Sequence, residues 1–187
     1  MTFGDESVCR RYLINKRWPD GARCPRCRRA MGLKAARSVF QCPRCGKQLS
    51  PTSGTIFHKS RLPLKAWFQA MHWMLTSPEG ISALELQKRL HLRSYRAAWL
   101  LTHKIRAVML SGDEALPWGE AKDHWRFIAR GRARPGTPHG WSSKYHRAYA
   151  AEFAYRARRA PNMRKAFDQL LADCIARTRA TLGEIKA

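Results

Sequence analysis

Cys24-Pro25-Arg26-Cys27 and Cys42-Pro43-Arg44-Cys45 are two Cys-x-x-Cys motifs separated by fourteen residues. Two cysteines three positions apart in a tight turn can direct both sulfurs at one ion, and a second such turn completes a closed tetrahedron of thiolates. Gly46 follows the second motif, where tolerance of a positive φ is useful, whereas Arg28 stands at the equivalent place after the first. The spacing predicts one structural Zn²⁺ ion with no coordination position open to a substrate, bound by Cys24, Cys27, Cys42 and Cys45. The alternatives, two disulfides or four unrelated buried thiols, are disfavoured by this spacing.

The residues around the two motifs indicate a zinc ribbon preceded by a helix. Val39-Phe40-Gln41 is predicted to be a short strand, and Ser53-Gly54-Thr55-Ile56-Phe57 a turn followed by another strand. The helix is predicted over residues 5–17, with Asp5 as its N-cap. Its apolar face is formed by Val8, Tyr12 and Leu13. Cys9 is expected to pack on that face rather than to bind the ion as a fifth ligand.

The charge of the chain indicates a polyanionic partner. The formal net charge is +23 and the isoelectric point is near 10.9, and the excess of Lys and Arg is spread along the whole sequence. Nucleic acid is the expected partner, because Lys and Arg that neutralise phosphates release counterions. A solvated basic surface or a ribosome-associated protein is the alternative. No apolar run reaches the roughly 18 residues of a membrane span, and the first residues lack a signal-peptide pattern. Because zinc requires reduced thiols, we expect the cytoplasm, in association with the nucleoid.

Residues 60–110 are predicted to form a helix-turn-helix. The first helical segment carries an apolar stripe at three- and four-residue spacing: Leu64, Trp67, Phe68, Met71, Met74 and Leu75. Ser82 and Glu85 form a capping box for a helix that runs to about Leu90, and Ser94 is the N-cap of the next. Two helices joined by the short turn His91-Leu92-Arg93 are typical of units whose second helix enters the major groove of DNA. The expected DNA contacts are Arg93, Tyr95 and Arg96 at base edges, and His103, Lys104 and Arg106 at phosphates. An ordinary helical hairpin with solvated charges is the alternative.

The last part of the chain is predicted to be an irregular segment followed by two helices. Residues 111–142 are punctuated by Gly and Pro and are interpreted as a linker or a DNA-contacting strap, with a basic run of Arg126, Arg130, Arg132 and Arg134. A helix from Ser142 to about Arg159 has Tyr145, Tyr149 and Phe153 on one stripe. Pro161 suits the first turn of the last helix, whose apolar stripe is Phe167, Leu170, Leu171, Cys174, Ile175 and Leu182. The two helices are expected to pair with each other or with a second copy of the chain.

The sequence therefore predicts a mainly α fold with a small β zinc ribbon, a helix-turn-helix and a C-terminal helical hairpin. Four domains are expected: the N-terminal helix and zinc ribbon (1–59), the helix-turn-helix DNA-binding domain (60–110), the basic linker (111–142) and the C-terminal helical pair (143–187).

Further motifs occur in one order along residues 5–109: Arg17-Trp18-Pro19-Asp20-Gly21, Ser53 to Phe57, Pro63-Leu64-x-x-Trp67, Gly80-Ile81-Ser82, and Ala97-Ala98-Trp99 through Arg106-Ala107-Val108-Met109. With the cysteine motifs, they resemble the N-terminal half of bacterial insertion-sequence transposases that carry a zinc ribbon ahead of a DDE-type (ISXO2-like) nuclease core. A later segment is similar to the one that closes the nuclease domain of that family: His139-Gly140, Tyr149-x-x-Glu152-Phe153-x-Tyr155-Arg156 and Phe167-Asp168-x-Leu170-Leu171.

The resemblance implies a ribonuclease-H-like catalytic sheet whose carboxylates hold two metal ions. Only residues 111 to about 142 separate the helix-turn-helix from the closing segment, and they show no alternating strand pattern. Asp113 lies where the first catalytic Asp of the family begins, but no second strand follows to bring a partner carboxylate to the metals. We therefore interpret Asp113 as a vestige and expect no catalytic residue.

The expected function is that of a transposase-derived DNA-binding protein of an insertion sequence, truncated and without strand-transfer activity. Its expected partners are double-stranded DNA and either another copy of itself or an intact transposase. One alternative is an active compact DDE-type nuclease using Asp113, Glu114, Asp123 or Glu152. The other is an RNA- or ribosome-binding zinc-ribbon module.

Overall fold

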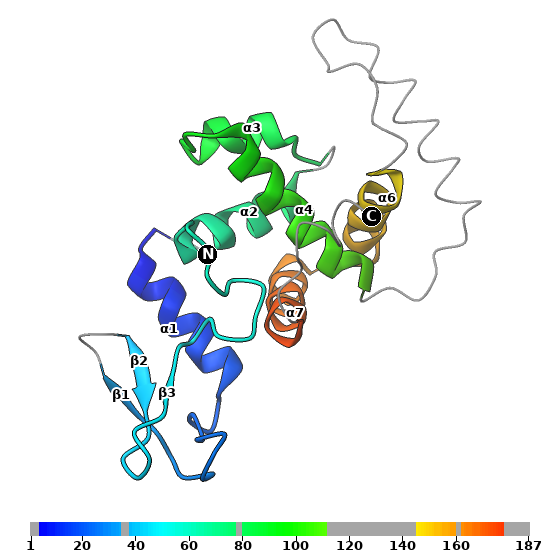
Figure 1. The fold of residues 1–187 in the computed structure, drawn as a ribbon. Helices are drawn as coiled ribbons and strands as arrows, with labels where there is room; N and C mark the ends of the chain where they lie inside the picture. The colour runs from blue at the N-terminus through cyan, green and yellow to red at the C-terminus, as the bar shows by residue number, and fades with distance from the viewer. Residues whose placement is uncertain (1–3, 35–37, 78–79, 112–144, 160–161, 178–187) are drawn as a thin grey trace, which may run out of the picture. The chain divides into compact units, whose positions relative to one another are not determined.

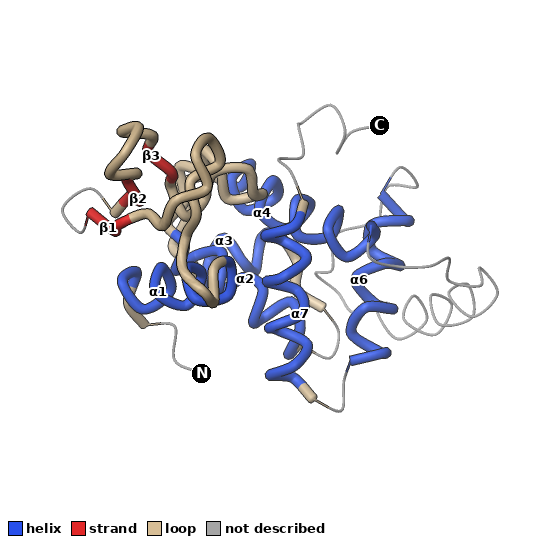
Figure 2. The backbone as a smooth tube through the Cα atoms, turned by 90° about the horizontal axis from the view of Figure 1, so that it is seen from below, coloured by secondary structure: helices blue, strands red, loops and turns tan. Residues whose placement is uncertain are grey.

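The computed structural model describes residues 4–34, 38–77, 80–111, 145–159 and 162–177. These residues belong to two compact units, one made of residues 1–72 and 171–187 and the other of residues 73–170. Figures 1 and 2 show that helices predominate among the described residues and that the strands of this part of the chain form one small sheet, which confirms the predicted mainly α fold. The four predicted domain limits stay a prediction. Among the described residues, no helix combines the length and apolar character needed to cross a lipid bilayer.

The sheet of the first unit has three antiparallel strands in the order β1 (Gly32–Lys34), β2 (Val39–Gln41) and β3 (Gln48–Leu49). The predicted strand over residues 39–41 is confirmed. The strand predicted after Ser53 is wrong, because the third strand lies directly behind the second cysteine motif and residues 51–59 form turns.

Side-chain hydrogen bonds explain why residues 51–59 do not form a strand. The Thr55 hydroxyl donates to the carbonyl of Thr52 at 2.7 Å and accepts from the N–H of Phe57 at 3.2 Å. These local bonds use backbone groups that a sheet would otherwise pair.

Helix α1 (Glu6–Arg17) begins where the sequence predicts. Asp5 is its N-cap and accepts from the N–H of Ser7 at 3.4 Å. Cys9 and Leu13 are fully buried, whereas Val8 is 43% exposed and does not belong to the buried face. The prediction that Cys9 is a packing residue is therefore confirmed, and the inclusion of Val8 in the apolar face is wrong.

Helix α2 (Leu64–Thr76) buries all six residues of its predicted stripe. Its N-terminus is capped by a distant residue, since the Glu6 carboxylate of α1 accepts from the N–H groups of Leu64 at 3.0 Å and of Lys65 at 2.8 Å. Pro63 precedes the helix and has no capping side chain, so Glu6 satisfies donors that would otherwise lack partners.

We expect Glu6→Ala to lower the free energy of unfolding by about 1 kcal/mol, because the first turn of α2 loses its cap. Thermal and urea unfolding measure this. Glu85→Ala is the matched control: the Glu85 carboxylate pairs with the exposed Arg89 of its own helix at 2.7 Å, so its removal is expected to cost less than about 0.5 kcal/mol. Equal losses in the two variants would contradict the capping role.

The second unit contains α3 (Ala83–Arg89), α4 (Tyr95–Ser111) and α6 (His146–Arg159). Ser82 caps α3 by accepting from the N–H of Glu85 at 3.0 Å, as the predicted capping box requires. Residues 90–94 connect α3 to α4, and the two helices pack against each other. His91 in this connection has a φ of 50°, and the bend ends the first helix.

Helix α6 packs along α4, and the two helices run parallel. Tyr145, which immediately precedes α6, meets Trp99, with ring centroids 5.4 Å apart; farther along both helices, Glu152 meets Arg106 at 2.6 Å. The C-terminal helices were expected to pair with each other or with a second copy of the chain, whereas the main helical neighbour of α6 within the described residues is α4. The buried face of α6 carries Ala151, Glu152, Ala154 and Tyr155, while the predicted stripe of Tyr145, Tyr149 and Phe153 is only half-buried.

Helix α7 (Met163–Ala176) follows its predicted stripe, since Phe167, Leu170, Leu171 and Cys174 are buried and Ile175 is half-buried. Leu182 and Pro161, and the basic run from Arg126 to Arg134, lie outside the described residues.

Candidate metal centre and nucleic-acid surface

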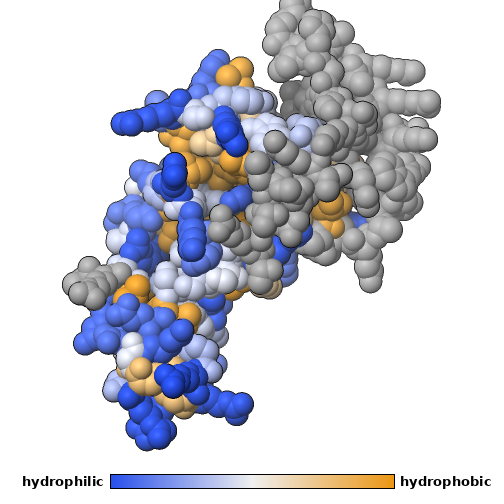
Figure 3. Space-filling view, in the orientation of Figure 1, coloured by the Kyte–Doolittle hydropathy of each residue, from blue (hydrophilic) through white to orange (hydrophobic). Residues whose placement is uncertain are grey.

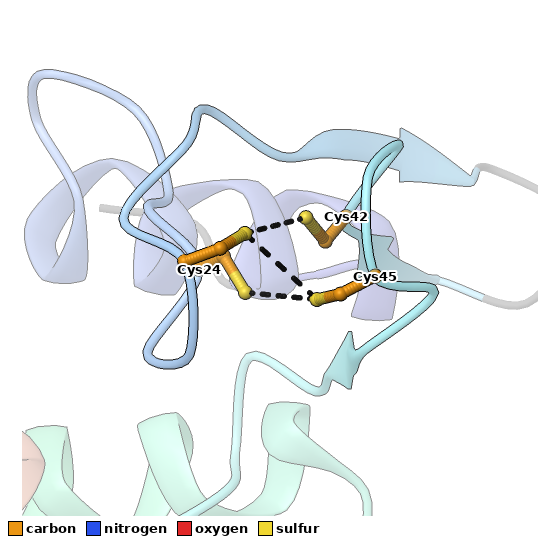
Figure 4. A group of neighbouring side chains, drawn as sticks. Cys24, Cys42 and Cys45 are labelled. Atoms are coloured by element: carbon orange, nitrogen blue, oxygen red, sulfur yellow. Dashed lines mark hydrogen bonds between the residues drawn. The ribbon is translucent and has the colours of Figure 1, made fainter.

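The sulfurs of the two cysteine motifs meet at one point, and all four lie within 4.8 Å of one another. The Sγ–Sγ distances are 3.5 Å between Cys24 and Cys45, 3.3 Å between Cys27 and Cys42, and 3.8 Å between Cys27 and Cys45. Figure 4 shows Cys24, Cys42 and Cys45 pointing toward one another from neighbouring loops. An ion with metal–sulfur bonds of about 2.3 Å in a tetrahedron places its sulfurs about 3.8 Å apart, so the cluster fits one structural Zn²⁺. A disulfide needs a distance of about 2.05 Å, and all the cysteines are free thiols.

The two motifs have the same backbone conformation. The N–H of Arg28 donates to the carbonyl of Cys24 at 2.8 Å, and the N–H of Gly46 donates to that of Cys42 at 3.0 Å. The φ angles of Arg28 and Gly46 are 58° and 68°. Arg28 therefore adopts a left-handed conformation, which costs a residue with a Cβ about 1 kcal/mol. The two turns, Cys24 to Arg29 and Cys42 to Lys47, are called knuckles below, and both close in the same way.

The donor set favours a cation. The backbone N–H of Cys45, with further N–H and thiol donors, lowers the pKa of Cys42 to about 6 despite burial. The hydrogen bond that Cys27 makes with Cys42 raises the pKa of Cys27 to about 11. The backbone donors around Cys42 therefore favour its thiolate form, and a divalent ion bound by the four sulfurs stabilises the thiolate form of each.

A small core surrounds the metal centre. It consists of Ala22, Cys24, Met31, Phe40 and Cys42. Trp18 extends this core by packing edge-to-face on Phe40, with ring centroids 5.1 Å apart. So few apolar side chains do not fold a module unaided, which makes the metal part of the folding energy.

Comparison with known proteins agrees with this geometry. Residues 4–48 match the family model of the transposase zinc-ribbon domain. We therefore refer to this part of the chain as the zinc ribbon. The chain is also 29% identical over 90 residues to an uncharacterized protein in the transposable element ISH50 of Halobacterium salinarum. The two matches support a protein related to insertion-sequence transposases.

The ISH50 match covers 46% of this chain and 31% of the relative. The chain therefore spans about a third of the length of that relative. No solved structure matches the chain.

The surface of the zinc ribbon is basic. No Asp or Glu occurs between Asp20 and Glu79. Between Asp20 and Leu49, the exposed cations of the described residues are Arg23, Arg26, Arg28, Arg29, Lys34, Arg44 and Lys47. Figure 3 shows hydrophilic side chains, in blue, over much of the visible face of the described residues. These cations outnumber the two net negative charges of a zinc ion with four thiolates, so a positive surplus remains.

The expected DNA contacts fall into two groups. Arg93, Tyr95 and Arg96, at the N-terminal end of α4, are exposed, and Lys104 is half-buried. His103 and Arg106 are 2% and 3% exposed and lie in the interior of the second unit. Side chains buried in this way do not reach a phosphate without unfolding their surroundings, so only the first group presents a surface to DNA.

The burial of Arg106 has a definite cause, which sequence reasoning missed. Its Nε donates to the Glu152 carboxylate at 2.6 Å, its Nη2 donates to the carbonyl of Ile81 at 3.2 Å, and the guanidinium lies 4.4 Å from the centroid of the Tyr149 ring. Gly80 adjoins the same group, since a Cβ there would lie 3.3 Å from Glu152 Oε1, and its φ is 77°. The motif Gly80-Ile81-Ser82 and the acidic residue of the closing segment were the signals for this arrangement.

His103 is held neutral by its surroundings. It stacks on Trp99, with ring centroids 4.1 Å apart, and also meets the rings of Tyr145 and Tyr149. Burial, together with the positive charge of Arg106, lowers the pKa of His103 from 6.5 to about 4. Below about pH 6.5 the unfolded chain binds a proton that the folded chain excludes, so folded-state stability falls as the pH drops toward 4.

We expect His103→Phe, which keeps an aromatic ring in the stack, to flatten the pH dependence of stability between pH 6.5 and about 4. Thermal unfolding of both proteins across this window measures the effect. Identical pH profiles in wild type and variant would contradict a buried neutral imidazole.

Proposed function

We propose that this protein binds the double-stranded DNA of an insertion sequence and does not cleave it. The observation that carries the proposal is the positive charge of a ribbon that matches a transposase zinc-ribbon domain and that carries no Asp or Glu after Asp20. Exposed Lys and Arg that have no carboxylates nearby attract phosphates over a long range and neutralise the phosphates that they contact.

Helices α3 and α4 supply the sequence-reading part of the proposal. They pack together across a short connection, and the first turn of α4 carries the exposed side chains of Tyr95 and Arg96, with Arg93 just before it. In a helix-turn-helix the N-terminal residues of the second helix contact base edges, and arginine bridges O6 and N7 of guanine with two hydrogen bonds.

The absence of strand cleavage is part of the proposal. Glu152, one carboxylate considered for a compact active site, is 3% exposed and paired with Arg106. A carboxylate held in this way is a structural partner rather than a metal ligand. Asp113, Glu114 and Asp123 lie outside the described residues. Incubation of the protein with Mg²⁺ and duplex DNA tests this point. Strand cleavage by a preparation that is free of contaminating nuclease would contradict the proposal.

We expect Arg96→Ala to weaken binding to the preferred duplex by about 1–3 kcal/mol and to relax the sequence preference at one or two positions. The preferred sequence comes from selection of the zinc-loaded protein against a random duplex library at physiological salt. Lys88→Ala, which removes an exposed cation from α3, is the control and is expected to leave the preference unchanged. A small uniform loss on all sequences for Arg96→Ala would contradict base reading.

Structured RNA is the competitor that tests the choice of DNA. If RNA displaces the duplex at equal concentration and no duplex sequence is enriched, the protein is an RNA-binding module instead.

The roles that the proposal includes are regulation of the element and interference with an intact transposase, by association with it or with a second copy of this chain. Both place the protein in the cytoplasm with the nucleoid.

A further inference from the structure

The zinc ribbon is built from two copies of one small unit, related by a shift of 18 residues. The N–H of Cys24 donates to the carbonyl of Arg29 at 2.8 Å, and the N–H of Cys42 donates to the carbonyl of Lys47 at 2.9 Å. These bonds show the same 18-residue shift as the bonds of Arg28 and Gly46 described above. The two knuckles are therefore the same structure made twice.

The repeat continues into the strands on either side. Arg23 pairs with Ala30 in an antiparallel bridge, and 18 residues later Gln41 pairs with Gln48 in the β2–β3 ladder. The buried residues correspond as well: Ala22 with Phe40, and Met31 with the half-buried Leu49. Each copy thus consists of a pair of short extended segments closed by a knuckle.

The sulfur distances show how the two copies are arranged. Exchange of the copies turns the pair Cys24–Cys45 into the pair Cys42–Cys27, and these two distances are 3.5 and 3.3 Å. Near-equal distances for exchanged pairs are what a local two-fold axis through the metal centre produces. Side chains at equivalent positions of the two knuckles are therefore related by this axis and lie on opposite sides of it.

Two of the equivalent positions carry cations in both copies. Arg26 corresponds to Arg44, and Arg29 corresponds to Lys47, and all four side chains are exposed. Neutralising the charge of a four-thiolate zinc centre requires two positive charges, so this arrangement has a surplus even before the other basic residues are counted.

We propose that Arg26 and Arg44, supported by Arg29 and Lys47, bind phosphates of duplex DNA on the two sides of the metal centre. The zinc ribbon is then a second DNA contact beside the first turn of α4, and the inference rests on the proposed function. The two-fold arrangement of the cations matches the two strands of a duplex, whose backbones are themselves related by local two-fold axes.

The chemistry of the ribbon surface favours a duplex over unpaired nucleotides. Proteins that bind single strands stack bases on exposed aromatic side chains. The aromatic residue of the described knuckles and strands, Phe40, is 7% exposed and lies in the core. The described knuckles and strands therefore offer charge for backbone contacts and no exposed aromatic ring on which a base could stack.

The double variant Arg26→Gln/Arg44→Gln of the full zinc-loaded chain tests the inference. Binding to one short duplex is measured over a series of salt concentrations. Loss of two phosphate contacts is expected to reduce the slope of log K against log salt by about 1.8. The zinc content and the ranking of preferred sequences are expected to stay unchanged, because neither a ligand nor a base contact is altered.

Two further variants separate a specific surface from net charge and from misfolding. Arg164→Gln/Lys165→Gln removes two exposed cations of α7, and its slope is expected to stay at the wild-type value. Arg26→Lys/Arg44→Lys keeps both charges and is expected to restore most of the binding. Equal losses in the α7 control, an unchanged slope in the Gln variant, or a loss seen with structured RNA but not with the duplex would each overturn the proposal.

Failure of the proposed function and failure of the ribbon contact give different results. If the wild type binds no duplex in a salt-dependent manner, the proposed function fails and this inference with it. If the wild type selects a duplex sequence and loses that preference in Arg96→Ala, but Arg26→Gln/Arg44→Gln keeps its slope, the inference about the ribbon alone is refuted.

Discussion

Cys42→Ser is expected to abolish stoichiometric zinc binding and to unfold the zinc ribbon. The four sulfurs lie within 4.8 Å of one another, and the ribbon core is too small to fold without the ion. Structural zinc in small modules supplies about 10–16 kcal/mol of apparent binding free energy. Loss of one ligand therefore removes more free energy than the stability of the folded ribbon. Metal analysis of the purified protein and circular dichroism with and without a chelator measure the two effects.

Cys9→Ala is the matched control for this experiment. Cys9 is as buried as Cys42, but it lies in α1 and not in the sulfur cluster. The control is expected to retain one zinc ion per chain and to lose about 1–2 kcal/mol of stability from the small cavity. A Cys42→Ser protein with full zinc content and an unchanged melting temperature would refute the structural metal centre.

Glu152→Leu is expected to destabilise the second unit by about 3–5 kcal/mol, because it leaves the guanidinium of Arg106 buried without its carboxylate. The two side chains are 3% and 4% exposed, and arginine does not lose its charge to relieve the cost. Urea unfolding measures the loss of stability, and amide hydrogen exchange in peptides from α4 and α6 shows whether it is located in these helices.

The double variant Arg106→Met/Glu152→Leu distinguishes a buried ion pair from simple overpacking. It removes both charges and is expected to recover most of the stability lost in the single variant. The exposed pair of Glu85 and Arg89 provides the comparison, and Glu85→Leu is expected to cost less than about 1 kcal/mol. A double variant no more stable than Glu152→Leu would show that the charge pair is not the cause.

Local features of the fold could be predicted from the sequence, because the interacting residues are near one another. Asp5 and Ser82 cap helices three or fewer residues away, and both caps are present as predicted. The metal centre belongs to the same class, since each knuckle holds both of its sulfurs within one turn. The strand predicted after Ser53 failed for a local reason too, because the hydroxyl of Thr55 bonds the backbone that a strand requires.

Features that depend on distant partners could not be predicted. Glu6 looks like an ordinary first-turn acid of its own helix, and its role as the cap of α2 depends on residues 58 and 59 positions away. Arg106 and His103 are polar residues on a basic chain, which favours a surface position on average. The carboxylate that makes burial of Arg106 tolerable lies 46 residues farther along. The sequence contains this acid and the motif Gly80-Ile81-Ser82, but their spacing from Arg106 does not by itself indicate the pairing.

The parallel packing of α6 on α4 has a consequence for the order in which the protein can fold during synthesis. Tyr145 and Glu152 leave the ribosome long after Trp99 and Arg106, and until they do, the face of α4 that they cover has no partner from α6. The ribbon, whose ligands span only residues 24–45, can close around its ion well before that. Nascent chains that stall between these points are therefore expected to hold a finished metal module beside an incomplete helical unit, which is the form that chaperones and proteases encounter.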